Sequence, residues 1–251
     1  MTEELIWQHF KDELARLSGG GETLDLWLRD DDAVVPSAAL DRLLTLTAGY
    51  GVPSTIAVIP KRSGAALARY LGAADLAAPV IHGWSHDNHA PAGQKKQELG
   101  SHRPLGTILE DLSTGLAVMR GLYGEKLVPM LVPPWNRIDA AVVPHLAALG
   151  FSALSTYGEP SFAAYLPIIN THVDIIDWQG SRGCRSHAAL AGDILGQLRR
   201  NVPARKPTGI LSHHLVQDEA AWNFLQKLFE LTNGQWKAAG HLIGESRSPG
   251  S

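Results

Sequence analysis

The chain has 251 residues, of which 45% are hydrophobic, and it is therefore long enough to bury a large core. Its 22 basic and 25 acidic residues give a formal net charge of −3, which excludes the strongly basic surface of nucleic-acid-binding proteins. The single cysteine, Cys184, excludes an internal disulfide. No stretch approaches the ~20 apolar residues of a membrane-spanning helix, and the acidic N-terminus lacks the charge of a secretion signal. We expect a cytoplasmic protein without nucleic-acid or membrane partners, and the oligomeric state stays open.

Short apolar runs alternate with longer helical patterns along the chain. After a helix expected at 3–17, strands are expected at 24–28, 55–59, 79–81, 127–132, 151–155, 168–170 or 173–176, and 208–211. The strands are almost continuously apolar, which is typical of parallel strands covered on both faces. Helices are expected between them at 37–48, 65–71, 107–122, 139–149, 187–200 and 218–231.

Several helix ends have local signals. Asp139 and Asp218 are predicted N-caps, and Gly150 is a predicted C-cap. Pro144 conflicts with a helix that starts at Asp139, so this helix either begins near residue 143 or kinks there.

The repeated alternation of strand and helix predicts a parallel sheet with right-handed crossovers. We expect an α/β fold, a single-domain, TIM-like, irregular (β/α)7 barrel, with a doubly wound open sheet as the second choice. The expected division is an N-terminal capping helix at 1–20, the barrel at 21–244 and a flexible tail at 245–251. The polar segment 84–103 is longer than most loops in compact domains, and loops of this length are usually functional or disordered.

Ionisable and aromatic side chains follow the predicted strands. They are Asp30, Asp31 and Asp32, then His82 and His86, then Trp135 and Arg137, then Asp177 and Trp178, and finally His213 and His214. Each group alone has an ordinary structural explanation, such as a helix cap or a packed ring. In a parallel barrel, however, all of these strand ends lie on one rim, where βα loops build active sites. The sequence therefore predicts one shared site.

His82, His86 and a carboxylate of the aspartate triplet could supply three ligands to one divalent metal. Structural zinc sites usually have four protein ligands that include thiolates, whereas catalytic sites keep a position open for water. This pattern favours a hydrolytic metal site.

Five short segments occur in a specific order. They read Leu28-Arg-Asp-Asp31-Asp32, His82-Gly-Trp-Ser-His86, Leu131-Val-Pro-Pro-Trp135, Asp177-Trp178 and Leu211-Ser-His213. In this order and spacing the chain resembles the polysaccharide deacetylase superfamily, also called NodB-homology or carbohydrate esterase family 4, over residues 24–214. It resembles a divergent, cytoplasmic member.

The chain departs from the pattern of that family at several positions. Gly83 replaces a small hydroxyl residue, and Val132 stands where the family has an arginine that holds the catalytic aspartate. Another cation, Arg29 or Arg137, would have to replace it. Asp177 and Trp178 are adjacent rather than separated.

The resemblance implies a metal-dependent hydrolase that removes an acyl group, most often acetyl, from an amide-linked substrate such as an N-acetylated saccharide. Asp32, His82 and His86 would hold one divalent ion, for which zinc is the first choice and cobalt, nickel or manganese are alternatives. Asp31 would be the general base. The triplet leaves a second register open, in which Asp30 and Asp31 form the base–ligand pair.

The remaining site residues would surround the substrate. His213 would be the general acid, oriented by Asp177. Trp135 and Trp178 would form apolar walls, and Asp30 and Arg137 would bind substrate or support the site.

Other functions on the same residues are less consistent with the sequence. In a zinc protease of the H-E-x-x-H type, Glu follows the first histidine, whereas Gly83 stands here. A two-carboxylate glycosidase leaves the histidines unexplained. A cyclic-amide hydrolase and a non-catalytic carbohydrate-binding relative stay open, as does the choice among a soluble saccharide, a nucleotide sugar and a small amide.

Overall fold

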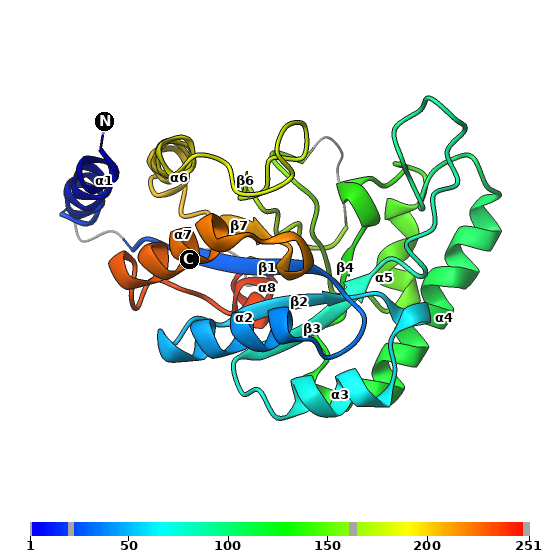
Figure 1. Cartoon of the computed structure of the whole chain (residues 1–251). Helices are drawn as coiled ribbons and strands as arrows, with labels where there is room; N and C mark the ends of the chain where they lie inside the picture. The colour runs from blue at the N-terminus through cyan, green and yellow to red at the C-terminus, as the bar shows by residue number, and fades with distance from the viewer. Residues whose placement is uncertain (1, 20–22, 161–164, 248–251) are drawn as a thin grey trace.

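The computed structural model describes residues 2–19, 23–160 and 165–247. Within them, seven parallel strands form one sheet in the order β5-β4-β3-β2-β1-β7-β6 (Figure 1). The strands are β1 (Leu26–Ala33), β2 (Ser54–Val58), β3 (Ala77–His82), β4 (Met130–Val132), β5 (Ala153–Leu154), β6 (Val173–Asp174) and β7 (Thr208–Ser212). The parallel sheet expected from the sequence is confirmed.

The segment before β6 connects the two edges of the sheet. Leu154 of β5 bridges to Ile168, and Tyr157 bridges to Thr171. The same segment then continues into β6, which pairs with β7. Of the two alternatives for the sixth strand, 173–176 is confirmed as the shorter β6, whereas 168–170 contributes only an isolated bridge at Ile168. The sheet curls into an irregular (β/α)7 barrel, as expected, and the doubly wound open sheet is wrong.

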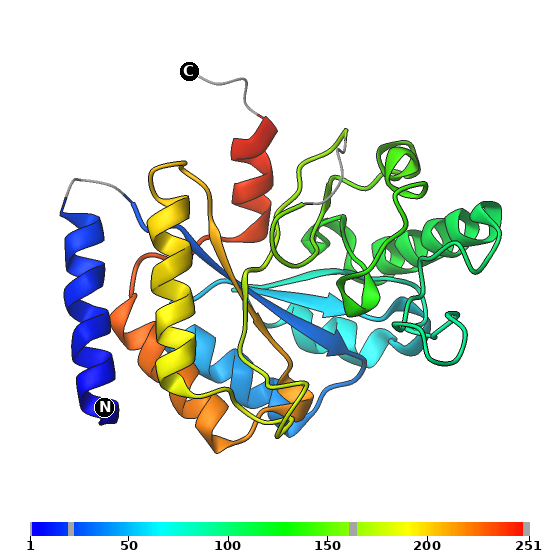
Figure 2. The same cartoon turned by 90° about the horizontal axis from the view of Figure 1, so that it is seen from above.

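Helices surround the sheet, as Figure 2 shows from above. They are α1 (Glu3–Ser18), α2 (Ala38–Gly49), α3 (Ala65–Gly72), α4 (Leu105–Tyr123), α5 (Leu146–Leu149), α6 (His187–Asn201), α7 (Glu219–Leu231) and α8 (Ala239–Arg247). Short 3₁₀ helices are η1 (Pro60–Arg62), η2 (Gly124–Lys126), η3 (Pro134–Asn136), η4 (Val143–His145) and η5 (His214–Val216). Among the described residues, none of the helices has the length and apolar character needed to cross a bilayer.

Two apolar clusters fill the molecule, because successive strand residues point to opposite faces of the sheet. Leu26 and Leu28 belong to the larger cluster, which lies between the sheet and the outer helices. Trp27 belongs to a second cluster inside the barrel, which includes Leu242 and Ile243 of α8. Helix α8 was not expected from the sequence.

Helix α8 lies at the end of the barrel where the strands begin. The chain just before it bridges to the start of β1, where Lys237 N donates to the Leu26 carbonyl oxygen over 2.7 Å. Leu242 and Ile243 of this helix fill the barrel interior from that end. The carboxyl ends of the strands are therefore the end that is available for a site.

Several predicted boundaries change in the structure. Strand β1 continues to Ala33, so the three aspartates lie within the strand rather than after it. The conflict at Pro144 is resolved by η4, which precedes the short α5, and Gly150 ends α5 in the left-handed region as expected. Asp218 caps α7 by accepting the Ala221 N–H. Helix α8 extends to Arg247, so three residues of the expected tail are helical and the other four lie outside the described residues.

Candidate metal centre and active site

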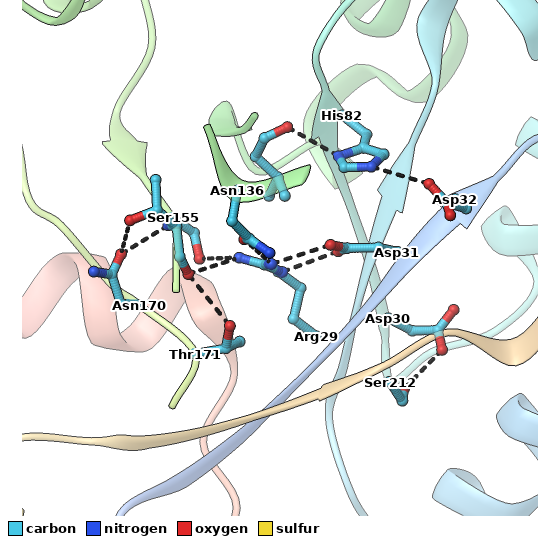
Figure 3. Close-up of polar contacts among 12 residues, drawn as sticks. Arg29, Asp30, Asp31, Asp32, His82, Asn136, Ser155, Asn170, Thr171 and Ser212 are labelled. Carbon is cyan, nitrogen blue, oxygen red and sulfur yellow. Dashed lines mark hydrogen bonds and ion pairs between the residues drawn. The ribbon is translucent and has the colours of Figure 1, made fainter. Parts of the chain in front are cut away.

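A bulge in β1 sets the directions of the three aspartates. Asp30 pairs with Ile56 of β2, whereas Ala33 pairs with Val58, so β1 contains one residue more than β2 between these pairs. Asp32 takes up the extra residue with a φ of 74°, a conformation that aspartate tolerates better than most residues. As Figure 3 shows, Asp31 points toward Arg29, Asp32 toward His82 and Asp30 toward Ser212.

Asp32 meets two imidazoles at this rim. Its Oδ1 lies 3.1 Å from His82 Nε2 and 3.3 Å from His86 Nε2. One possible ligand atom from each of the three residues lies within 4.8 Å of the others. His82 Nδ1 donates to the Val132 carbonyl oxygen over 2.9 Å, which directs Nε2 at Asp32; in the neutral ring this Nε2 carries the lone pair. This is the tautomer that a metal-ligating histidine needs.

The electrostatics of the three residues match a cation site. Burial alone would raise the pKa of Asp32, but its hydrogen bond to His82 and the charges of His82, His213 and His86 hold this pKa below its ordinary value. Burial and the charge of His82 lower the pKa of His86. An ionised carboxylate and a neutral imidazole are the forms that bind a divalent ion.

His82 lies deeper and shows the opposite shift. Burial alone would lower the pKa of His82, but the charges of Asp31 and Asp32 and the hydrogen bond to Asp32 outweigh it and raise this pKa. The environment of the ring is thus strongly negative, and such an environment stabilises a bound cation.

Arg29 holds the carboxylate of Asp31 inside the barrel (Figure 3). Arg29 Nε lies 2.9 Å from Asp31 Oδ1, and Nη2 donates to Oδ2 over 3.0 Å. The guanidinium also donates to Asn136 Oδ1, Ser155 Oγ and the Thr156 carbonyl oxygen, at 2.6, 2.7 and 3.2 Å. Of the two cations considered from the sequence, Arg29 is the one that contacts the aspartate.

Arg137 has a different contact. Its Nη1 donates to the carbonyl oxygen of Lys96 over 2.7 Å, which fastens the segment 84–103 to the loop after β4. On the same loop, Trp135 has a φ of 55° and its ring centroid lies 4.3 Å from that of His86. Trp135 is thus a wall of the site, and Arg137 is a tether of the neighbouring loop.

Asp30 does not face the imidazole pair. Its Oδ2 accepts from Ser212 Oγ over 2.7 Å and from His214 N over 2.9 Å, and its Oδ1 pairs with His214 Nδ1. Burial alone would lower the pKa of His214, but Asp30 outweighs it and raises this pKa. Asp30 therefore joins β1 to the end of β7, and the structure brings Asp32, not Asp31, to the imidazoles.

His213 directly follows β7, which pairs with β1 on the side away from β2 and β3. Trp178 packs edge-on against its ring with centroids 4.8 Å apart. The Nε1 of Trp178 donates to Asp174 Oδ2 over 2.8 Å. Asp174 interacts electrostatically with His213, and burial together with the charge of Asp31 raises the pKa of Asp174.

Asp174 therefore acts on His213, and Asp177 has another role. The carboxylate of Asp177 accepts the N–H groups of Gly180 and Ser181 at 3.0 and 3.2 Å, which closes its own turn. Asp174 was not among the site residues expected from the sequence. A signal was present, since Asp174 lies in a predicted strand, where it pairs with Leu211 two residues before His213.

Comparison with solved structures identifies the fold. A protein described as a polysaccharide deacetylase from Mycobacterium smegmatis superposes with a TM-score of 0.65 at 16% identity, over 92% of this chain and 94% of that one. A family 4 acetyl xylan esterase from Clostridium thermocellum, in complex with cobalt, gives a TM-score of 0.54 at 18% identity, over 89% and 92%. A family 4 pseudoenzyme from Bacillus anthracis gives 0.57 at 16% identity, over 88% and 66%.

The chain thus has the fold of the family 4 carbohydrate esterases and polysaccharide deacetylases, and the low identities fit a divergent chain. The resemblance inferred from the sequence is confirmed in the fold. No protein-family model and no curated protein sequence matches the chain.

Proposed function

We propose that the chain is a metal-dependent deacetylase that hydrolyses carbon–nitrogen amide bonds, other than peptide bonds, in substrates such as N-acetylated saccharides. The observation that carries the proposal is the position of Asp31, a buried carboxylate held by Arg29, beside the ligand group Asp32, His82 and His86. The structural neighbours, which include a protein described as a polysaccharide deacetylase and an acetyl xylan esterase, support the same reaction.

Asp32, His82 and His86 would hold one divalent ion. Two imidazoles and a carboxylate are a donor set for zinc, and cobalt, nickel or manganese are alternatives. Such an ion would polarise the substrate carbonyl and activate water as the nucleophile. The cobalt in the Clostridium thermocellum esterase is consistent with a divalent ion on this fold.

Two side chains would move protons. Asp31 accepts a proton from the attacking water, and the contacts of Arg29 keep its carboxylate directed at the site. His213 donates a proton to the leaving amine nitrogen, and the carboxyl group of Asp174 interacts electrostatically with its ring. Asp31 lies on β1 and His213 follows the neighbouring β7, so one group would serve the nucleophile and the other the leaving group.

The aromatic residues would line the substrate. Trp135 beside His86 and Trp178 beside His213 present flat apolar walls, and Trp178 is 37% exposed. An indole face suits a sugar ring. We propose a small saccharide or another small amide as the substrate, rather than nucleic acid or a membrane component. We also propose that the protein is cytoplasmic and that residues 21–244 form its barrel domain.

Metal content and acyl release test the proposal on the same preparations. The purified protein should bind one equivalent of zinc or cobalt and release acetate from N-acetyl amino sugars. The Asp31→Asn variant should keep the metal and lose turnover, whereas Asp32→Asn should lose the metal. Asp75→Asn, at an exposed position, is the matched control.

The outcomes separate the alternatives. Absence of metal binding overturns the proposal. Metal binding without release of acetate from sugars, but with opening of a cyclic amide, favours the cyclic-amide hydrolase. Metal binding without any turnover favours a non-catalytic carbohydrate-binding role, which the fold of the Bacillus anthracis pseudoenzyme permits.

A further inference from the structure

A buried carboxylate supports the segment that carries the second histidine. Glu98 is 1% exposed and lies on the returning part of the loop 84–103. Its Oε1 accepts from Ser85 N, Ser85 Oγ and His86 N, at 2.7, 2.9 and 3.1 Å. Its Oε2 accepts from Trp84 N at 3.2 Å. Three successive backbone N–H groups therefore converge on one carboxylate.

Gly83 makes this arrangement possible. Its φ is +59°, a conformation that favours glycine. A β-carbon at position 83 would lie 2.0 Å from Glu98 Oε2 and 2.6 Å from Pro134 Cδ. The carboxylate thus occupies the volume that any side chain at position 83 would need. Since the resembled family carries a small hydroxyl residue there, this chain holds the segment between its histidines differently.

The hydrogen bonds of Glu98 fix the backbone of His86. This residue has a φ of 59°, which is unfavourable for histidine and needs support from its surroundings. The bond from His86 N to Glu98 supplies this support beside the imidazole that faces Asp32.

The charge of Glu98 also reaches the site. Its buried carboxylate accepts the backbone N–H of His86, next to the imidazole that faces Asp32. Any cation held between His86 and Asp32 would be attracted by this carboxylate. Charged hydrogen bonds and low solvent exposure both strengthen such an effect.

We infer that Glu98 is a positioning residue that sets the metal affinity of the centre, and that the loop 84–103 is a structural part of this centre. Glu98 acts through the backbone of His86 and through its charge, without coordinating the ion. The inference rests on the proposed metal site at Asp32, His82 and His86.

The test compares metal affinities of the full chain. Dissociation constants for zinc and cobalt are measured by competition with a chelating dye for the wild type, Glu98→Gln and Glu110→Gln. Glu110 is an exposed residue of α4 and gives a matched change of charge. Glu98→Gln should weaken binding roughly 10-fold or more, as loss of a partner that supports a ligand does, and Glu110→Gln should bind as the wild type does.

Two further readouts separate positioning from general stability. The visible spectrum of bound cobalt reports ligand geometry, and we expect it to change in Glu98→Gln. The rise in Tm caused by metal grows with affinity, so it should be smaller in Glu98→Gln than in the wild type. A merely structural role would lower the Tm of the metal-free protein and leave the spectrum and the affinity unchanged.

Each outcome bears on one claim. If the wild type binds no metal, the proposed function fails. If the wild type binds metal and Glu98→Gln matches it in affinity and spectrum, only the inference about Glu98 fails. If Glu98→Gln does not fold, Ser85→Ala decides the question, because it removes a single hydrogen bond to Glu98. Ser85→Ala should weaken metal binding by a smaller factor, and an unchanged affinity would overturn the inference.

Discussion

Arg29 contacts both carboxylate oxygens of Asp31, and the arginine side chain is fully buried while that of the aspartate is 3% exposed. A buried ion pair of this kind is costly to desolvate, but its removal from one side leaves an uncompensated charge. Arg29 has further acceptors on the loops after β4 and β5. The pair therefore fixes the direction of Asp31 before any substrate enters.

Replacement of Arg29 should affect both stability and turnover. Arg29→Gln leaves Asp31 buried without a cation, and we expect a loss of about 3–5 kcal/mol in the free energy of unfolding, together with loss of acyl release. Urea unfolding measures the first effect and an acetate assay the second. Arg42→Gln is the control, because Arg42 pairs with Glu219 at the surface and such pairs contribute about 1 kcal/mol or less. Equal losses in both variants would contradict the role of Arg29.

Removal of His213 should depend on the leaving group. An amine is a poor leaving group that must be protonated to depart, whereas an activated phenol leaves without being protonated. His213→Ala should therefore slow amide hydrolysis by roughly 10²–10⁴-fold and slow hydrolysis of an activated acetate ester much less. Asp174→Asn should follow the same pattern more weakly. Asp177→Asn is the matched control, because Asp177 closes its own turn, and it should keep the ratio of the amide rate to the ester rate. If His213→Ala instead loses activity equally on both substrates, His213 is not the general acid.

His172 should make stability depend on pH. Burial and the charges of Arg200 and Lys206 lower its pKa to about 4, and its Nδ1 must stay unprotonated to accept the Gly209 N–H at 3.0 Å. The unfolded chain binds a proton near pH 6.5 and the folded chain only near pH 4. Stability is thus retained above pH 6.5 and lost as the pH falls to 4, by up to about 3 kcal/mol.

The comparison of wild type with His172→Asn isolates this contribution. Asn can accept the same hydrogen bond but does not titrate. Chemical unfolding at pH 7 and at pH 4 should show a smaller loss in the variant than in the wild type. Identical losses would show that other groups account for the acid sensitivity.

Gly209 should be intolerant of any side chain. A β-carbon there would lie 2.5 Å from Trp27 Nε1 and 2.7 Å from the Asn170 carbonyl oxygen, inside a barrel that is already filled. Gly209→Ala should lower the free energy of unfolding by about 1–3 kcal/mol or more. Gly192→Ala in α6 has no atom within 4 Å of the new carbon and should stabilise by about 0.5–1 kcal/mol. In thermal unfolding, the Tm of Gly209→Ala should fall and that of Gly192→Ala should rise if the packing inside the barrel is as described.

The convergence of the site was predictable because parallel strands end at one rim. Asp32 lies on β1, and His82 and His86 lie at and after the end of β3, with β2 between the two strands. The same argument placed His213 at the rim. The convergence follows from the common direction of parallel strands, which the alternation of strands and helices predicts. The bulge at Asp32, which sets the directions of the aspartates, is a finding of the structure.

The supporting residues depend on three-dimensional contacts. Only the tertiary structure shows that Arg29, and not Arg137, contacts Asp31, because this depends on which guanidinium points into the barrel. Asp174 replaces Asp177 beside His213 because the path of the loop after β6 turns Asp177 back on its own backbone. The types and the spacing of the proposed ligands can be read from the sequence. The groups that orient these ligands are distant in the sequence, and only the packing of the folded chain decides where their side chains point.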